Sequence, residues 1–395
     1  MQIHLSCNRL QAKSAKNMSS RAKRFRCQGG ILNIKEKHKP YFAERMPINM
    51  TKMLEEIKQQ PSVLSQLEEA NRETLNALIK EMKVKNIKNA VLAGRGTSDH
   101  ACIFAQYVLG LTCGIVTGLA IPSLLTLYRC KPDFSSHLVI GISQSGKAAD
   151  ALSLIDAANT SGGISVAITN DPESPMALAA KYHLYCNAGP EISVAATKTF
   201  TAQMGLVLLL AAYLTENETL LAAFRRLPDA MRKLDELCDE KITETALSFR
   251  YMKDGFVLSR GITYPVALES MLKIQETCYV KMRGYAVSDF YHGPLAQVDA
   301  ETPVIVLTPN GVTHQDHLDM IDRLRSIGTQ PLVVAPENSD ALSGTNQFAI
   351  PDTGNEITDA FLFAMFAQRF SECLCGLKGL NPDAPRNLKK VTVTR

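Results

Sequence analysis

The sequence predicts an α/β protein built from two consecutive domains, each a parallel sheet flanked by helices. Short β-branched runs such as residues 138–140 and 164–169 alternate with helical patterns, which is typical of βαβ units. Two loop patterns recur at one fixed offset along the chain. The 395 residues, 46% of them hydrophobic, provide enough apolar surface for two sizeable cores.

The repeat is visible in two pairs of loops that each follow an apolar run. Gly94-Arg-Gly96 is echoed by Ser259-Arg-Gly261, and Ser143-Gln-Ser-Gly146 is echoed by Thr308-Pro-Asn-Gly311. Both pairs are separated by the same 165 positions (259 − 94 and 308 − 143). Two loops recurring at one offset indicate a duplicated domain.

In the first half, residues 51–84 show a helical pattern that Pro61 divides into two helices. Strands are expected at 89–93, 114–119, 138–140, 164–169 and 182–186, and helices at 101–111, around 124, at 148–158 and at 199–215. In the second half, a charged helical connector at 217–249 is followed by strands at 255–258, 302–307 and 331–336 and a helix at 266–279.

The predicted organisation has six parts. They are a basic leader at 1–49, N-terminal helices at 50–84, a first sheet domain at 85–216, a connector at 217–250, a second sheet domain at 251–380 and a tail at 381–395.

The net charge of +4 is distributed unevenly along the chain. Residues 1–49 hold 11 Lys and Arg against two Glu, a net +9, so the remainder is mildly acidic at −5. The leader is interpreted as a disordered segment, with a transit peptide or basic tail as the alternative. The acidic body does not suggest a nucleic-acid partner.

The ten Cys are scattered without a C-x-x-C pair, which fits a reducing compartment. No secretory signal is visible, and the longest apolar run, 204–214, is too short to span a bilayer. We therefore expect a cytoplasmic protein without a membrane partner.

The loop Ser143-Gln-Ser-Gly146 is expected between a buried strand and a helix N-terminus, which favours anion binding. Ser98 follows the neighbouring strand, so both loops should meet at the carboxyl edge of one sheet. The alternative is an ordinary βα turn. Because Pro309 and Asn310 replace Gln144 and Ser145 in the second copy, one phosphate site per tandem unit is expected.

Glu269, Lys273 and Glu276 have spacings of four and three, which place them on one face of the helix 266–279. A solvated salt-bridge face is the alternative, but the other positions of this helix are largely apolar. Buried carboxylates beside a lysine are candidates for an acid/base group.

His292 precedes Gly293-Pro294 in a loop, where it could shuttle a proton or be structural. The β-branched tail after Lys389 and Lys390 could fray, or fold back and place an amine in a site. The remaining histidines show no metal-ligand spacing, so no metal is expected.

Together these motifs resemble the sugar isomerase (SIS) domain family in its tandem form. The nearest resemblance is to the isomerase half of glutamine–fructose-6-phosphate aminotransferase and to stand-alone glucosamine-6-phosphate deaminases. The resemblance covers residues 51–395 and implies two SIS domains, each a flavodoxin-like three-layer sandwich, with no cofactor. The matching segments are Gly94-Arg-Gly-Thr-Ser98, Ser143-Gln-Ser-Gly146, Gly189-Pro-Glu191, Val194-Ala-Ala-Thr-Lys198, Tyr264-Pro265 through Glu276, His292-Gly-Pro-Leu295 and Pro385-Arg-Asn-Leu388.

The resemblance also implies roles for individual residues. Glu276 would move a proton between C1 and C2, Lys273 would be its partner, and His292 would open the sugar ring from a neighbouring subunit of a homodimer. Lys390 would close over the sugar, with Lys389 as the alternative. The phosphate would be held by Thr97, Ser98, Ser143, Gln144 and Ser145, and the rest of the substrate by Gly96, Val194, Ala195 and Glu269.

The chain departs from the aminotransferase pattern in three ways. Lys147-Ala148 replaces Glu-Thr after the phosphate loop, and Ala195-Ala-Thr-Lys198 replaces Ala-Ser-Thr-Lys. The leader is too short for a glutaminase domain, so we expect no use of glutamine. The favoured function is therefore a phosphosugar isomerase-type deaminase that converts glucosamine 6-phosphate into fructose 6-phosphate and ammonia.

Three alternatives remain open at this point. The enzyme could be a deglycase of a 6-phosphorylated sugar–amine conjugate, or an isomerising transaminase-like enzyme with a separate ammonia source. A non-catalytic phosphosugar sensor is the alternative from another class of protein, since this fold also serves in regulators.

Overall fold

The computed structural model describes residues 50–344 and 346–390 of the chain. The predicted basic leader, 1–49, and the last five residues of the predicted tail lie outside the described residues.

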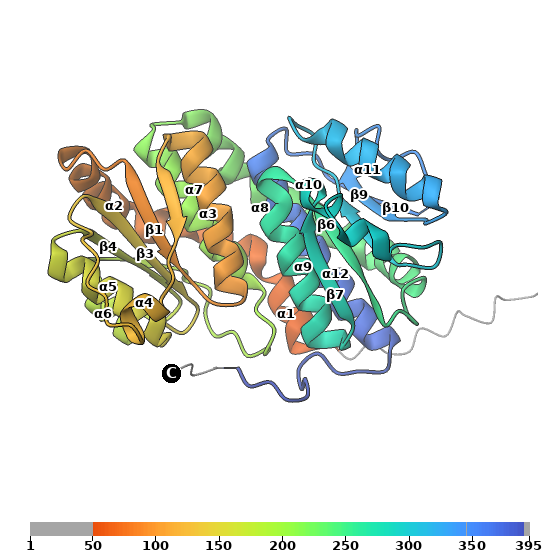
Figure 1. Cartoon of the computed structure of the whole chain (residues 1–395), viewed down its shortest axis with the longest axis horizontal. Coiled ribbons are helices and arrows are strands. Elements are labelled where there is room, and N and C mark those ends of the chain that lie inside the picture. The colour runs from red at the N-terminus through yellow and green to blue at the C-terminus, as the bar shows by residue number, and fades with distance from the viewer. Residues whose placement is uncertain (1–49, 345, 391–395) are drawn as a thin grey trace, which may run out of the picture. The chain divides into compact units, whose positions relative to one another are not determined.

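Two five-stranded parallel sheets form the framework (Figure 1). The first has the order β2-β1-β3-β4-β5 and the second the order β10-β9-β8-β6-β7. The strands of the first sheet are β1 (Asn89–Ala93), β2 (Val116–Leu119), β3 (His137–Ser143), β4 (Ile164–Thr169) and β5 (Tyr182–Tyr185). Those of the second are β6 (Asp254–Ser259), β7 (Lys281–Ala286), β8 (Val304–Leu307), β9 (Leu332–Pro336) and β10 (Gln347–Ile350).

The strand positions confirm the duplication. β6, β7 and β10 begin 165 positions after β1, β2 and β5 (254 − 89, 281 − 116 and 347 − 182). When equivalent strands are matched in this way, the two sheets have the same strand order. The predicted α/β class with tandem sheets is therefore correct.

The helices of the first half begin with α1 (Lys52–Lys58) and α2 (Gln60–Val84), and Pro61 occupies the first turn of α2 as expected from its missing N–H. The others are α3 (Thr97–Cys113), α4 (Ser123–Thr126), α5 (Ala149–Ser161), α6 (Pro175–Ala179), α7 (Lys198–Leu214) and the connecting α8 (Glu218–Leu247).

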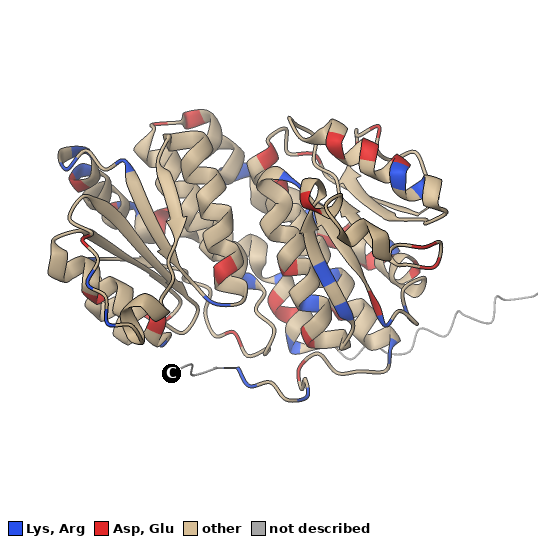
Figure 2. Ribbon diagram, in the orientation of Figure 1, with Lys and Arg blue, Asp and Glu red and all other residues tan. Residues whose placement is uncertain are grey.

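The helices of the second half are α9 (Tyr264–Cys278), α10 (Val287–Phe290), α11 (His314–Ile327) and α12 (Glu356–Leu377), with short 3₁₀ turns at Gly261–Thr263 and Pro294–Gln297. Figure 2 shows acidic and basic residues along α11, whereas α7 is almost free of charge. This contrast follows their positions, because nearly every residue of α7 is buried.

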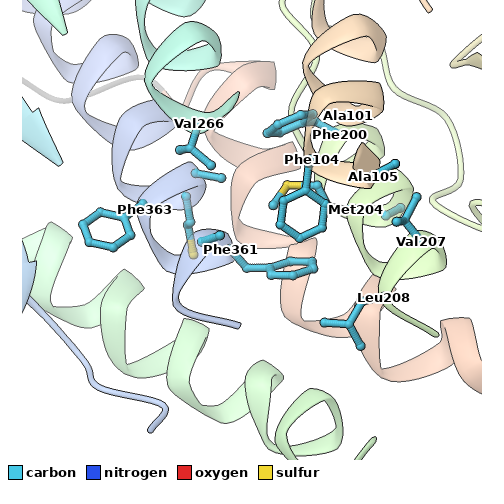
Figure 3. Packing of buried hydrophobic residues seen from close by; sticks show 14 of the residues in the cluster. Ala101, Phe104, Ala105, Phe200, Met204, Val207, Leu208, Val266, Phe361 and Phe363 are labelled. Atoms are coloured by element: carbon cyan, nitrogen blue, oxygen red, sulfur yellow. The ribbon is translucent and has the colours of Figure 1, made fainter. Parts of the chain in front are cut away.

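Helices from both halves share one core. α3 packs against α7 and α9, and α12 packs against α8 and α9. Phe104 of α3 meets Phe361 of α12 edge to face, with ring centroids 5.8 Å apart, and both are fully buried (Figure 3). The two sheets are therefore parts of one hydrophobic unit.

The predicted boundaries at the two candidate phosphate loops were wrong. α3 begins at Thr97 rather than at 101, and β3 continues to Ser143 rather than ending at 140. Gly94 permits the early helix start, because a Cβ there would lie 2.5 Å from the Ser98 carbonyl oxygen. Thr97 and Ser98 thus lie in the first turn of a helix.

α12 is the one helix in the described part of the chain that is long and apolar enough to cross a membrane. Since 83% of its apolar window is buried inside the fold, it has the environment of a core helix.

The shared core predicts the effect of truncating Phe104. Phe104→Ala should lower the free energy of unfolding by about 3–5 kcal/mol, because it removes a fully buried ring and leaves a cavity. Urea unfolding measures the change. Leu111→Ala on the same helix is the control and should cost under about 0.5 kcal/mol, since Leu111 is 70% exposed. Equal losses for the two variants would contradict the shared core.

Candidate active site

A buried lysine between two carboxylates is the main feature of α9. Lys273 Nζ lies 2.6 Å from Glu276 Oε2 and 3.2 Å from Glu269 Oε1. The side chains of Lys273 and Glu269 are completely buried, whereas 21% of the Glu276 side chain is exposed. The predicted stripe on one helix face is thus a buried ion triad, and only Glu276 is open to a ligand.

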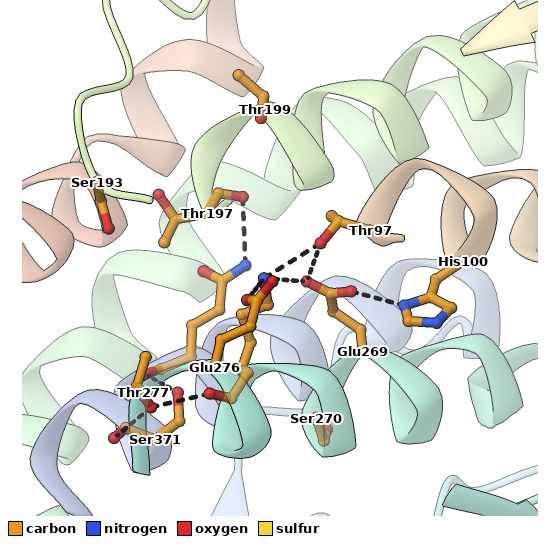
Figure 4. Close-up of polar contacts among 12 residues, drawn as sticks. Thr97, His100, Ser193, Thr197, Thr199, Glu269, Ser270, Glu276, Thr277 and Ser371 are labelled. Carbon is orange, nitrogen blue, oxygen red and sulfur yellow. Dashed lines mark hydrogen bonds and ion pairs between the residues drawn. The ribbon is translucent and has the colours of Figure 1, made fainter. Parts of the chain in front are cut away.

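The first turns of α3 complete this cluster from the other half of the chain. Thr97 Oγ1 donates to Glu269 Oε1 (3.0 Å) and accepts from Lys273 Nζ (3.1 Å). His100 Nδ1 lies 2.7 Å from Glu269 Oε2. Figure 4 shows Thr97 and His100 reaching the same carboxylate. The helix that follows the first loop therefore fixes the position of the charged groups on α9.

The charges in the cluster stabilise one another. Burial lowers the pKa of Lys273, but the Glu269 and Glu276 carboxylates raise it by more, so the net shift is upward. Burial raises the pKa of Glu269, but Lys273 and His100 lower it by more, so the net shift is downward. Lys273 and Glu269 are consequently both charged at neutral pH.

A pocket of about 570 Å³ lies beside Glu276. Tyr279, Arg283 and Arg386 line it together with Glu276 and neighbouring residues. The Arg386 guanidinium stacks 4.0 Å from the centre of the Tyr279 ring, so the tail forms one wall. The carboxylate that is accessible on α9 thus faces a space large enough for a small molecule.

The two predicted phosphate loops lie at adjacent strand ends, because β1 and β3 pair in parallel with Ala93 opposite Gly141. Ser143 Oγ accepts from Gly146 N (3.2 Å), and Gln144 and Ser145 remain half-buried. Gly146 has φ +62°, and a Cβ there would lie 2.0 Å from Ser174 Oγ, so glycine is required. The N-terminus of α5 that follows has no side-chain cap.

Gly96 and Ser98 lie where the neighbouring loop joins α3. Ser98 is buried and its Oγ accepts from Gln203 Nε2 (3.2 Å). Gly96 has φ +56° and precedes the first residue of α3. Arg95 forms an ion pair with Asp150 in the first turn of α5 (2.5 Å) and thereby ties the two loops together.

The tail folds back onto the segment that precedes α7. Lys390 Nζ donates to Glu191 Oε2 (3.0 Å) and to Ser193 O (2.6 Å), whereas Lys389 is exposed. Within the same segment Ala195 is fully buried and Val194 is half-buried. Lys390 is therefore the tail lysine that contacts the body of the protein.

Glu191 is the buried anchor of this segment. Its carboxylate accepts from Thr197 N (3.0 Å), Thr199 N (3.1 Å) and Thr199 Oγ1 (2.8 Å). Burial raises its pKa, but Lys390 and these amides lower it by more. Glu191 is thus ionised and holds both the segment and the tail.

His292 lies elsewhere in this chain. It is exposed in the turn after α10 and lines a pocket of about 270 Å³ with Arg260, Tyr291 and Asp316. It does not line the pocket beside Glu276. The structure of the single chain therefore brings Glu276 together with Lys273 and Glu269, but neither His292 nor the residues of the two predicted phosphate loops line the pocket beside Glu276.

Four residues that support the site were not predicted. His100 and Gln203 hold Glu269 and Ser98, Arg95 ties the two loops, and Glu191 anchors the tail. Their partners are distant in sequence, so no local spacing pointed to them. In residues 50–344 and 346–390 no three His, Cys, Asp or Glu side chains form a cluster able to hold a metal ion.

Comparison with known proteins agrees with this architecture. The model of the SIS domain family matches residues 83–213 and 251–371, which correspond to the two sheets and their helices. The chain belongs to the SIS domain family. Both halves that share the 165-residue repeat are therefore SIS domains.

Among curated relatives, a glutamine–fructose-6-phosphate aminotransferase [isomerizing] from Methanothermobacter thermautotrophicus is 32% identical over 345 residues, covering 86% of this chain and 57% of the relative. The chain thus spans little more than half the length of the curated relatives that it matches.

Two solved structures show the same fold. The C-terminal domain of glucosamine-fructose-6-phosphate aminotransferase from Francisella tularensis has a TM-score of 0.72 and 24% identity, covering 85% of this chain and 98% of that one. Glucosamine-6-phosphate deaminase from Thermotoga maritima has a TM-score of 0.68 and 20% identity, covering 87% of this chain and all of that one.

The ion triad predicts an acid-dependent loss of stability. Because the pKa of Glu269 is lower in the folded state, its contribution is complete above the unfolded value of about 4.3 and is lost as the pH falls below it. Glu269→Gln should be less stable than wild type at pH 7 by about 3–5 kcal/mol, since Lys273 loses one buried partner.

Urea unfolding from pH 7 to pH 3 measures this effect. The stability difference between wild type and Glu269→Gln should narrow below about pH 4.3 by up to about 1.4 kcal/mol per pH unit. Glu236→Gln, at an exposed position of α8, is the control and should show no such change. A stability difference between the two proteins that stays constant from pH 7 to pH 3 would contradict the assigned charge of Glu269.

Proposed function

We propose that this protein interconverts aldose and ketose forms of a 6-phosphorylated amino sugar, with Glu276 as the proton carrier. The observation that carries the proposal is the position of Glu276, which alone among the α9 triad is exposed to a pocket while Lys273 lies 2.6 Å from its carboxylate. A fixed cation beside a carboxylate at a pocket wall can stabilise the negative charge that develops when a proton leaves carbon.

The phosphate would bind where the loops after β1 and β3 meet. Thr97, Ser98, Ser143, Gln144 and Ser145 supply hydroxyl and amide groups there, and the uncapped N-terminus of α5 supplies backbone N–H groups. Gly96 allows close approach of the chain to the ligand. The segment with Val194 and Ala195, held by Glu191 and Lys390, would cover the sugar.

The chemical steps combine these positions with the roles that the family resemblance implies. In the proposed reaction, His292 from a second copy of the chain promotes opening of the sugar ring. The Glu276 carboxylate then removes the proton from C2 and returns it to C1, while Lys273 stabilises the charged intermediate. Glu269 has no exposed surface, so we assign it to positioning Lys273 rather than to contact with the sugar.

We propose glucosamine 6-phosphate as the substrate and fructose 6-phosphate and ammonia as the products. Proton transfer from C2 to C1 turns the 2-amino group into an imine, and water then adds to C2 and releases ammonia. The Ser-Asp-His that follows Gly-Arg-Gly-Thr supports this choice, because it resembles the stand-alone deaminases. The isomerising name of the 32% identical relative supports the shared C1–C2 chemistry.

The substrate assignment predicts ammonia release. Purified protein supplied with glucosamine 6-phosphate should produce ammonia and fructose 6-phosphate in equal amounts, measured by coupled assays. Fructose 6-phosphate with glutamine is the comparison reaction and should yield no glutamate. Turnover of another phosphosugar without ammonia would reject the substrate, and consumption of glutamine would reject the direction.

Replacing the proposed proton carrier should separate binding from chemistry. Glu276→Gln keeps the size of the side chain but cannot accept the proton, so kcat should fall by roughly 10²–10⁴-fold while substrate binding is retained. Steady-state kinetics and calorimetric titration measure the two effects. Glu173→Gln, at an exposed position away from the pocket, is the control. An unchanged kcat for Glu276→Gln would exclude Glu276 as the proton carrier.

A further inference from the structure

The pocket beside Glu276 has a positively charged wall that the proposed reaction does not use. Lys281, Arg283 and Arg386 are three of its ten lining residues, and Glu276 is the one acidic residue among them. The Glu276 carboxylate already pairs with Lys273 Nζ at 2.6 Å, so it does not neutralise these three cations. The pocket therefore carries an excess of positive charge, which favours an anionic ligand.

The three cations reach the pocket from two distant segments. Lys281 and Arg283 alternate with the buried Met282 along β7, so their side chains lie on one face of this strand. Arg386 belongs to the segment after α12, where its backbone N–H donates to Tyr279 Oη (2.9 Å) and its guanidinium stacks on the same ring. Figure 2 shows basic residues on both segments. Tertiary packing thus brings together charges that are 103 positions apart (386 − 283).

These cations have no acidic partner in the described part of the chain. None of the ion pairs formed there involves Lys281, Arg283 or Arg386. The two guanidinium groups lie over aromatic rings instead, with Arg283 5.5 Å from the centre of the Phe256 ring and Arg386 4.0 Å from that of Tyr279. Stacking holds a guanidinium by its flat face and leaves the N–H groups at its edge able to bind an anion.

Protection of a sheet edge is the simpler explanation for part of this charge. β7 is the outermost strand of the second sheet, and lysine on an edge strand discourages pairing with another chain. This explanation accounts for Lys281 but not for Arg386, which lies outside the sheet and is held at the same cavity by Tyr279. Edge protection also does not require a cavity of about 570 Å³. Recognition of a ligand accounts for both the cavity and the convergence of the charges.

We propose that Lys281, Arg283 and Arg386 form a binding site for a second anionic group, a carboxylate or a phosphate, beside the proposed proton carrier. The paired N–H groups of a guanidinium match two oxygens of such a group, and a lysine adds a point charge. The proposed 6-phosphate site is separate, because no residue of the loops at 94–96 and 143–146 lines this pocket. The site therefore goes beyond the single anionic group that the proposed function requires.

The second anionic group can come from two sources with the same chemistry. One source is an acidic substituent on the nitrogen of the amino sugar, and it rests on the proposed function, in which C2 of the sugar lies at Glu276. The other source is a separate small anion, which would bind to the wall whatever reaction the protein catalyses. Binding measurements with sugar-borne and free carboxylates distinguish the two.

Calorimetric titration of the full chain with three probes tests the site. The first probe is N-carboxymethylglucosamine 6-phosphate, the second is N-(2-hydroxyethyl)glucosamine 6-phosphate, whose substituent is uncharged, and the third is citrate. For a sugar-borne group, the first probe should bind roughly 10- to 100-fold more tightly than the second, as charge-assisted hydrogen bonds provide. For a separate anion, citrate should bind and the two sugars should bind equally.

Substitutions in the wall should weaken whichever binding is observed. Arg283→Gln and Lys281→Gln should each lower the preference for the carboxymethyl probe, or the affinity for citrate, by roughly 10-fold. Arg283→Lys should lose less than Arg283→Gln, because it keeps the charge that the site uses. Arg226→Gln is the matched control and should bind like wild type, because Arg226 is exposed on α8 and does not line the pocket.

Two results would overturn the proposal. One is a wild type that neither prefers the carboxymethyl probe nor binds citrate. The other is binding that remains as strong in Arg283→Gln and Lys281→Gln as in Arg226→Gln, since the anion would then lie elsewhere on the protein.

The ammonia assay with glucosamine 6-phosphate keeps this proposal apart from the proposed function, because binding of the probes needs no turnover. Wild type that shows the expected binding but releases no ammonia would support the anion site and reject the function. Ammonia release by a protein that shows no such binding would reject the anion site and leave the function standing.

Discussion

The buried ammonium of Lys273 is the interaction on which the arrangement of the two halves at the site depends. It is surrounded by Glu269 and Glu276 from its own helix and by Thr97 from the other half of the chain. Removing a charge from water is costly unless it is paired, so the cluster is stable only when α3 and α9 are packed together. The same packing places Thr97, at the start of α3, 3.1 Å from the ammonium group that also contacts the accessible carboxylate of Glu276.

Under the proposed function, this dependence explains how a duplicated fold would hold a single phosphosugar site. The first half contributes the two loops that carry hydroxyl groups, and the second half contributes α9 with its charged residues. In the second half Pro309 and Asn310 replace Gln144 and Ser145, so this loop lacks the glutamine amide and the second hydroxyl, while Thr308 keeps the first hydroxyl. The two SIS domains therefore differ in the groups that they offer, although their sheets have the same strand order.

Much of the fold could be predicted from the sequence because its signals are local. Runs of β-branched residues predicted the strands, and Pro61 predicted the division between the first two helices. The 165-residue offset predicted the duplication. β7 gave no clear strand signal because Lys281 and Arg283 interrupt its apolar pattern. β10 gave none because it has only four residues. The start of α3 was missed because Gly94 allows a close approach of backbone that no hydrophobic pattern encodes.

The candidate site, like the fold, could be predicted only where its signals are local in the sequence. The spacing of Glu269, Lys273 and Glu276 gave their common helix face, but their burial depends on Thr97 and His100, which lie about 170 positions away. The same holds for Lys390, whose partner Glu191 is 199 positions distant. Such pairs are created by tertiary packing. Residue type and spacing alone could therefore not exclude a solvated salt-bridge face on the helix or a frayed tail.

The most direct test of the account is the fate of the proton that Glu276 is proposed to carry. Turnover of glucosamine 6-phosphate that carries deuterium at C2, followed by NMR of the fructose 6-phosphate formed, reports whether the hydrogen removed from C2 is returned to C1. The account predicts deuterium at C1 of the product with wild type and neither product nor deuterium above background with Glu276→Gln. Equal deuterium incorporation by the two proteins would contradict it.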